Sequence, residues 1–361
     1  MSMKMLSSLS SVMVAMMAMA CSGGGPEAAT TGERSAPILR GADAPDSEFA
    51  AVGALGVPVS GRLRYFCSGT LIGPHTVLTA KHCVDFGRGR EVHFMLGADS
   101  TAPTRTVGVL TMATALPQAG GEMDLGSDVG ILQLAEDITD IEPIALPSRV
   151  LGEGDVGTAL TAVGYGIRDN AGRSGSRQMG HETLRATSGQ PFHVLFATFD
   201  EFTEYMIQAY GVGELSEEEI QSHYDFELLS EYEVWMGHQE GDAQSCNGDS
   251  GGPLLGDDGG QRVVFGVASW VFRGRNEPCH MGTAYAVLGP GARELVDASL
   301  SDPCWGLGAE GRCEGSVSLS CVVDEEGNPS LARVDCSEPR MVCVAGACRP
   351  RSLRIPPRPR P

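Results

Sequence analysis

The sequence predicts an all-β protein, folded as a sandwich or a barrel. Short runs of β-branched and apolar residues recur along the chain, and turns containing glycine and proline separate them. No helices alternate with these runs, as they would in a protein built on a parallel sheet. The clearest expected strands are Leu63–Ile72, Thr76–Ala80, Val92–Leu96, Thr104–Thr111, Val129–Leu134, Ala159–Tyr165 and Arg262–Trp270.

Two segments favour helices instead. Ser216 is followed three residues later by Glu219, which is the Ser-x-x-Glu capping pattern of a helix start. Acidic residues directly after Ser216 suit the positive end of a helix dipole. Ala292–Leu300 can form a second short helix near the end of the β-rich region.

The first residues have the features of an export signal. Residues 1–20 carry Lys4 and then an apolar run that is too short to span a membrane. Cys21 follows small residues and resembles the lipidated cysteine of a bacterial lipoprotein. Ala18-Met19-Ala20 would serve equally well as the cleavage site of an ordinary secretory peptidase. We therefore expect an exported protein, either lipid-anchored or freely secreted. Residues 21–37 are expected to form a tether or pro-segment.

The cysteines indicate disulfides. The chain has 11 cysteines. When Cys21 is set aside, the remaining number is even, as a disulfide framework in an oxidising compartment requires. Six of them fall in residues 301–348, a segment too small to bury an adequate core without about three bridges. Zinc binding is the alternative, although the segment has neither C-x₂-C spacing nor histidine. Residues 349–361 alternate arginine and proline and are expected to be an extended tail.

The charge is strongly negative and unevenly distributed. A formal net charge of −20 disfavours nucleic acid as a partner. Many of the acidic residues fall in residues 200–242, and no lysine or arginine occurs between Arg185 and Arg262. We expect a solvated acidic insertion there. Calcium binding is the weaker alternative, because no loop has EF-hand spacing.

The most informative segment is the run of residues 246–253, with the sequence Cys-Asn-Gly-Asp-Ser-Gly-Gly-Pro. Glycines on both sides of Ser250 let a sharp turn display its hydroxyl group. They also let the N–H groups of Gly248 and Ser250 point at one spot, where an oxyanion could form. A serine alone is inert at neutral pH, so this interpretation requires a positioned base.

Candidates for the base, and for an acid that orients it, lie upstream of Ser250. His82 lies in Thr-Ala-Lys-His-Cys after an apolar run, and Asp128 precedes an alternating, strand-like run. Taken singly, His82 fits a packed histidine and Asp128 a turn acid. In the order His82, Asp128, Ser250, the three motifs over residues 38–300 resemble the trypsin/chymotrypsin-like serine proteases.

This resemblance implies a fold and two disulfides. The family has two six-stranded antiparallel barrels, with the triad in the cleft between them and a short closing helix. Residues 38–300 would form this protease domain. Cys67 would pair with Cys83 beside His82, and Cys246 with Cys279 beside Ser250. Each bridge would brace a wall of the site.

The resemblance also implies an activation switch. Ile38-Leu39-Arg40-Gly41 is similar to the start of a mature protease of this family. There, a new N-terminal ammonium folds inward and pairs with the acid beside the serine, which here is Asp249. A buried carboxylate needs such a partner. The chain departs from the family at residue 37, where proline is a poor site for most processing enzymes.

The specificity pocket can be assigned by the same resemblance. The residue six before the serine forms its floor, which here is Gln244, so a cationic substrate side chain would find no carboxylate. Ser269 and Val271 would form one wall, and Gly282 or Thr283 the other. Val271 would narrow the entrance, as in elastase-like members of the family; the alternative is that it fills space in a pocket altered by neighbouring loops. The pocket is expected to prefer small or medium uncharged residues before the scissile bond.

The sequence therefore predicts an exported serine endopeptidase that acts on proteins or peptides by a His82–Asp128–Ser250 triad. It requires no cofactor or metal, and a membrane would be contacted only through a lipid on Cys21. The alternative is a cell-surface binding protein whose protease-like domain is catalytically silent. The sequence leaves the oligomeric state open.

Overall fold

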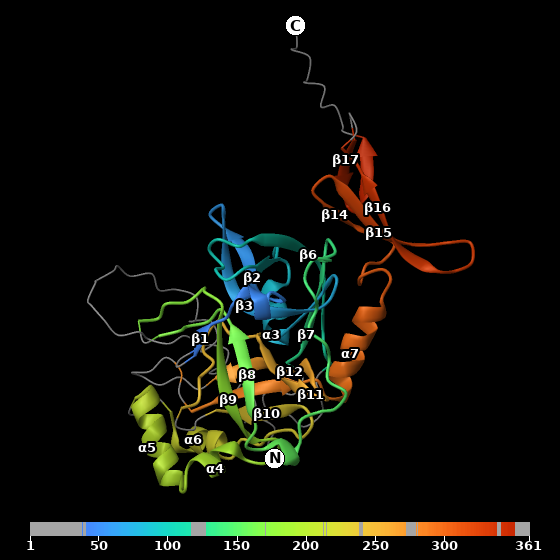
Figure 1. The fold of residues 1–361 in the computed structure, drawn as a ribbon. Coiled ribbons are helices and arrows are strands. Elements are labelled where there is room, and N and C mark those ends of the chain that lie inside the picture. Colours follow the sequence, from blue (N-terminus) through green and yellow to red (C-terminus); the bar gives the residue numbers. More distant parts are fainter. Residues whose placement is uncertain are drawn as a thin grey trace, which may run out of the picture. The chain divides into compact units, whose positions relative to one another are not determined.

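The computed structural model describes residue 38 and residues 41–116, 128–169, 171–211, 213, 215–237, 241–271, 279, 281–337 and 341–350 (Figure 1). The expected export signal, Cys21, the tether and most of the arginine- and proline-rich tail lie outside these residues. Within the described residues, no helix is both long and apolar enough to cross a membrane.

The first half of the β-rich region forms one closed antiparallel barrel. Its strands follow each other around the ring in the order β2-β3-β4-β7-β6-β5. All of the expected strands between residues 63 and 134 are present with small shifts at their ends. The strands are β2 (Val52–Val59), β3 (Arg62–Gly73), β4 (Thr76–Thr79), β5 (His93–Leu96), β6 (Arg105–Thr114) and β7 (Gly130–Leu134).

The second half forms another antiparallel barrel. Six strands follow each other as β8-β9-β10-β13-β12-β11, and the pairing of β11 with β8 closes the ring. The two-residue strand β1 (Ala42–Asp43) pairs with β9 outside this ring. The ring consists of β8 (Ala159–Gly164), β9 (Gln178–Ala186), β10 (Glu233–Met236), β11 (Pro253–Asp258), β12 (Gln261–Val271) and β13 (Thr283–Val287).

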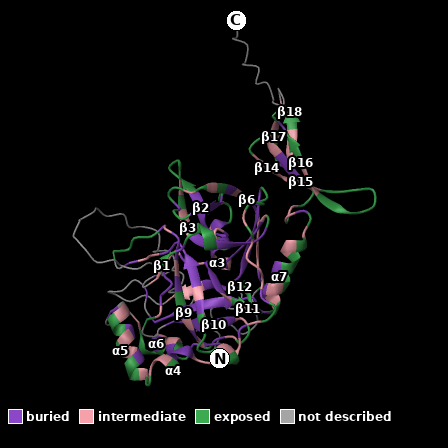
Figure 2. Cartoon of the chain, viewed as in Figure 1, coloured by how far each residue is buried: buried purple, intermediate pink, exposed green. Residues whose placement is uncertain are grey.

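The two barrels confirm the predicted fold class. Figure 2 shows buried residues concentrated in the strands, and β4, β7 and β13 are buried along their whole length. A closed barrel leaves no free sheet edge, so every strand can be paired on both sides. The expected C-terminal helix is present as α7 (Pro290–Ser301).

The acidic insertion is helical. Residues 200–242, where we expected it, contain most of α5 (Phe199–Tyr210) and all of α6 (Glu217–Tyr224), and α4 (Pro191–Leu195) comes just before them. Residues 233–236 of the same range instead form the buried barrel strand β10. The predicted cap of α6 is confirmed, because Ser216 accepts from the Glu219 N–H while the Glu219 carboxylate accepts from the Ser216 N–H.

An aromatic core that the charge pattern did not reveal holds these helices to the second barrel. Phe202 and Trp235 are fully buried, and Trp270 of β12 lies 6.1 Å from Trp235 between ring centroids. Glu201, Glu217 and Glu218 are exposed. The insertion is therefore solvated on its acidic side and anchored through its aromatic side.

The C-terminal segment is a small disulfide-linked β module. Its strands are β14 (Arg312–Glu314), β15 (Val317–Val323), β16 (Pro329–Asp335), β17 (Met341–Val344) and β18 (Ala347–Pro350). The bridges are Cys304–Cys321, Cys313–Cys343 and Cys336–Cys348, so these six sulfurs are not zinc ligands.

The last strand of this module extends into the residues that we expected to form the tail. Arg349 and Pro350, which we expected in the extended tail, belong to β18. They pair with Val342 and Met341 of β17, so the backbone pairing extends two residues past the last cysteine.

Trp305 joins the module to the first barrel. Its ring stacks on His75 with centroids 3.8 Å apart, and its carbonyl accepts a hydrogen bond from the Thr111 hydroxyl. Leu319 of the module is buried against Leu110 of β6 in the same small cluster. The module thus shares a hydrophobic contact with the barrel.

We predict that Trp305→Ala destabilises the full chain by about 2 kcal/mol, because it removes a stacked, half-buried ring. Urea unfolding of the purified protein measures the change. Leu116→Ala is the matched control, since Leu116 is 79% exposed, and it should leave the free energy of unfolding unchanged. Equal stability of the two variants would contradict the contact.

Candidate active site

The serine lies on a turn that only glycines allow. Gly248 and Gly251 have φ values of +99° and +77°, in the region that L side chains rarely adopt. A Cβ on Gly251 would also lie 2.1 Å from the Thr79 hydroxyl oxygen. The turn closes through a 3.0 Å hydrogen bond from Asp249 N to Cys246 O. The Cys246–Cys279 bridge, one of the two pairs that the family resemblance implies, begins at the same turn.

The expected oxyanion donors are unoccupied by protein groups. Among the described residues, no acceptor takes a hydrogen bond from the N–H of Gly248 or of Ser250. The carbonyl of Asn247, in the same peptide group as the Gly248 N–H, accepts from Ile167 N at 2.9 Å. Because the C=O and N–H of a trans peptide point in opposite directions, this bond fixes where the Gly248 N–H points.

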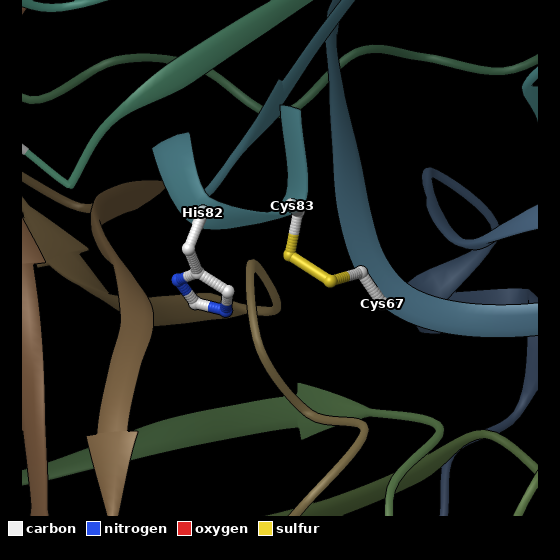
Figure 3. A group of neighbouring side chains, drawn as sticks. All are labelled: Cys67, His82 and Cys83. Carbon is white, nitrogen blue, oxygen red and sulfur yellow. A yellow bond between two sulfur atoms is a disulfide. The ribbon is translucent and has the colours of Figure 1, made fainter. Parts of the chain in front are cut away.

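His82 lies in the first turn of the short helix α3 (Lys81–Gly87), directly after β4. Its neighbour Cys83 is bonded to Cys67 of β3, the second pair that the resemblance implies. Figure 3 shows the imidazole and the disulfide side by side below this helix. Ligand atoms of Cys67, His82 and Cys83 lie within 4.8 Å of one another. Since the two sulfurs are bonded to each other, neither is a thiolate that could hold a metal ion.

Asp128 orients His82. Its Oδ2 lies 2.8 Å from the His82 Nδ1, and its Oδ1 accepts from the His82 backbone N–H at 2.9 Å. The Ser269 hydroxyl of β12 donates to the same Oδ2. Burial alone would lower the pKa of His82, but the attraction of the Asp128 carboxylate and its hydrogen bond outweigh burial, so the pKa is raised.

The serine turn lies beside the histidine helix, although no hydrogen bond between the described residues joins Ser250 Oγ to His82 Nε2. Ser250 O accepts from Ser68 N at 2.8 Å, and a Cβ on Gly251 would lie 2.9 Å from Ala80 N. Ala80 precedes α3 by one residue. Catalytic hydrogen bonds are often long without substrate and tighten in the reacting complex.

Asp249 is a buried carboxylate held by backbone groups. It is 2% exposed and accepts from Gly166 N at 2.7 Å and from Cys246 N at 2.8 Å. No cation lies against it among the described residues. Burial raises its pKa to about 7. Ile38, its expected partner, is also buried, but its nitrogen is an amide in the uncleaved chain and carries no charge.

The expected pocket residues fall into two groups. Gln244 accepts from the Gly282 N–H at 3.3 Å, and Val271 pairs with Thr283 across β12 and β13. The Nε2 of Gln244 and the hydroxyl of Thr283 are buried without a hydrogen-bond partner among the described residues. Ser269, in contrast, donates a hydrogen bond from its hydroxyl to Asp128.

The sequence reasoning missed Glu182. This side chain is 0% exposed in β9 and accepts from both the N–H and the hydroxyl of Ser245, each at 2.7 Å. The Ser245 hydroxyl also lies 2.8 Å from the Tyr285 hydroxyl. Burial raises the pKa of Glu182 to about 7. The alternation of β9 could have revealed it, since Glu182 shares the buried face with Leu184.

Two antiparallel six-stranded barrels, with a carboxylate-bound histidine beside a glycine-framed serine, define the chymotrypsin-like class of protein. The family model described as Trypsin matches residues 38–214 and 197–288. The chain belongs to the trypsin family, which confirms the resemblance drawn from its motifs.

The relatives of the chain carry corresponding names. It is 25% identical over 237 residues to a trypsin-like protease of Streptomyces glaucescens, an alignment covering 65% of this chain and 73% of that protein. It is 28% identical over 223 residues to fibrinolytic enzyme isozyme C of Lumbricus rubellus, covering 59% and 78%. It is 24% identical over 214 residues to trypsin-1 of Astacus astacus, covering 57% and 77%.

We predict that Glu182→Gln removes part of the pH dependence of stability. The folded-state pKa of Glu182 is about 7, against an ordinary 4.5, so the folded protein binds more protons than the unfolded chain between these values. Its stability therefore falls as pH rises through this window. The glutamine variant should gain on the order of 3 kcal/mol relative to the parent between about pH 4.5 and pH 7.

Guanidinium unfolding at several pH values measures this gain. Glu217→Gln, at an exposed acid of α6, is the control and should follow the parent. If the Glu182 and Glu217 variants show the same slope of stability against pH, the buried carboxylate is not the cause.

Proposed function

We propose that this protein is a serine endopeptidase that cleaves protein or peptide substrates through an acyl-enzyme. The observation that carries the proposal is the His82 Nδ1–Asp128 Oδ2 contact of 2.8 Å, beside a turn whose Gly248 and Ser250 N–H groups have no acceptor among the described residues. Acyl transfer from a serine requires a base that a carboxylate orients and a pair of N–H donors that can bind the oxyanion.

The mechanism assigns a role to each of these groups. Ser250 Oγ attacks the peptide carbonyl while His82 takes its proton, and the Gly248 and Ser250 N–H groups stabilise the oxyanion. His82 then protonates the leaving amine. Water repeats the sequence on the acyl-enzyme, with His82 again as the base. Asp128 keeps the imidazole in the reactive tautomer and stabilises its charged form.

We predict that Ser250→Ala loses labelling by a fluorophosphonate and lowers kcat by on the order of 10⁶-fold, because the nucleophile is gone. Labelling and peptide hydrolysis are measured on the same preparations. Ser245→Ala, which removes another buried hydroxyl five residues earlier, is the control and should retain labelling. Labelled Ser250→Ala would refute the nucleophile, and an unlabelled parent that already begins at Ile38 would favour the silent binding protein.

For selectivity, we propose small or medium uncharged residues before the scissile bond. Gln244, as the pocket floor, would offer an amide and no carboxylate, and Val271 would narrow the entrance. A buried cationic side chain would be left without a charge partner at Gln244.

Chromogenic peptides ending in alanine or valine should therefore be cleaved at least about 10-fold faster, in kcat/KM, than matched arginine peptides. Gln244→Asp should reduce this ratio by adding the missing charge. Faster cleavage of the arginine peptide by the parent would contradict the assignment.

We further propose that the protein is exported, with a lipid on Cys21, and is activated by cleavage before Ile38. The buried Asp249 supports the second step, since an ammonium at Ile38 would compensate its charge. The charge pair would return the pKa of Asp249 below about 7.

The N-termini of the precursor and of the active enzyme test these two steps. Mass spectrometry should find lipidated Cys21 at the start of the precursor and Ile38 at the start of the active form. Fully active protein with another first residue would exclude the switch, and an unmodified Cys21 would exclude the lipid anchor.

A further inference from the structure

Ser68 of β3 contacts the serine turn with its backbone and its side chain. It is fully buried, and its N–H donates to Ser250 O at 2.8 Å. Its hydroxyl donates to Gly248 O at 3.0 Å and accepts from the Tyr165 N–H at 3.1 Å. We propose, on the basis of the proposed function, that Ser68 is a positioning residue whose hydroxyl holds the oxyanion hole in its reactive geometry.

The argument rests on the two peptide groups that flank Gly248. In the first, Asn247 O accepts from Ile167 N at 2.9 Å, which aims the Gly248 N–H. In the second, Gly248 O accepts from the Ser68 hydroxyl, and Asp249 N donates to Cys246 O at 3.0 Å. Both peptide planes are therefore held by hydrogen bonds.

Gly248 needs this restraint because it has no side chain to limit its rotation. Its φ of +99° is one of several regions open to glycine. Among the described residues, Ser68 provides the side-chain hydrogen bond to the Gly248 carbonyl. Without it, the bond from Asp249 N to Cys246 O is the remaining described hydrogen bond on the plane between Gly248 and Asp249, so the Gly248 and Ser250 N–H groups are held less firmly relative to each other.

The hydroxyl is itself held by a rigid part of the molecule. Tyr165, whose N–H it accepts, is fully buried after β8, and the Tyr165 hydroxyl lies 2.6 Å from Gly97 O of the first barrel. The Ser68 carbonyl also accepts from the Thr79 hydroxyl at 2.8 Å. Ser68 thus connects both barrels to the serine turn, whose Gly248 and Ser250 N–H groups would bind the oxyanion.

Fixing the two donors should stabilise the transition state more than the bound substrate. Donors that are fixed before reaction stabilise the developing oxyanion more than the substrate carbonyl. Loss of the hydroxyl should therefore lower kcat and the affinity for a transition-state analogue while leaving KM nearly unchanged. It also leaves two buried backbone groups, Tyr165 N–H and Gly248 O, without a partner.

The test compares Ser68→Ala with Thr70→Val in the active enzyme. Thr70 is the matched control because it is fully buried on the same strand, and its hydroxyl has no hydrogen-bond partner among the described residues. The readouts are kcat, KM and the inhibition constant of a peptidyl trifluoromethyl ketone, whose adduct places an oxyanion between the two donors.

Ser68→Ala should lose roughly 10-fold in kcat and in ketone affinity. Its KM and all constants of Thr70→Val should stay near those of the parent. If Ser68→Ala folds poorly, Ser68→Gly removes the same hydroxyl without adding a contact, and the inhibition constant reports only on folded enzyme. Parent-like kcat and ketone affinity in the alanine or glycine variant would overturn the inference alone. A parent without turnover would overturn the proposed function as well.

Discussion

The Asp128 carboxylate is the interaction on which the rest of the site depends. It precedes β7 of the first barrel and binds both the ring and the backbone N–H of His82. It also accepts from Ser269 of β12 in the second barrel. One side chain therefore fixes the orientation of the imidazole and ties it to the other barrel. The nearly complete burial of Asp128 strengthens each of these contacts, because little water competes for its oxygens.

The serine turn is organised by a different constraint. Its glycines permit the sharp turn, but they also leave the backbone free to rotate, so outside groups must hold it. Ile167, Ser68 and the Cys246–Cys279 disulfide supply that restraint from three separate segments. The second barrel meanwhile buries two carboxylates, Asp249 and Glu182, without a cation among the described residues. Burial raises both pKa values to about 7, so the charged form of each carboxylate is disfavoured in the uncleaved chain, and a new N-terminal ammonium could stabilise the charged form of Asp249.

Much of this architecture could be predicted from local sequence. Short strands, the Ser216 cap and the motifs around His82, Asp128 and Ser250 are local patterns, and the structure confirms the strands and the cap. The aromatic core of the insertion was missed because its rings come from three helices and from the strands β10 and β12, which no single period relates. Glu182 was missed because residues 178–186 were not among the predicted strands, so the alternation that places Glu182 on the buried face with Leu184 was not considered. The hydroxyl of Ser68 gains its role through Gly248, which is 180 residues away.

The most direct test of the account is the tautomer of neutral His82, measured by ¹⁵N NMR of the histidine-labelled protein above the pKa of its ring. If Asp128 accepts from the ring as the 2.8 Å contact implies, the proton should reside on Nδ1, leaving Nε2 free to act on Ser250. Asp128→Ala should lose this preference. A neutral ring protonated at Nε2 in the parent would contradict the assignment of His82 as the catalytic base.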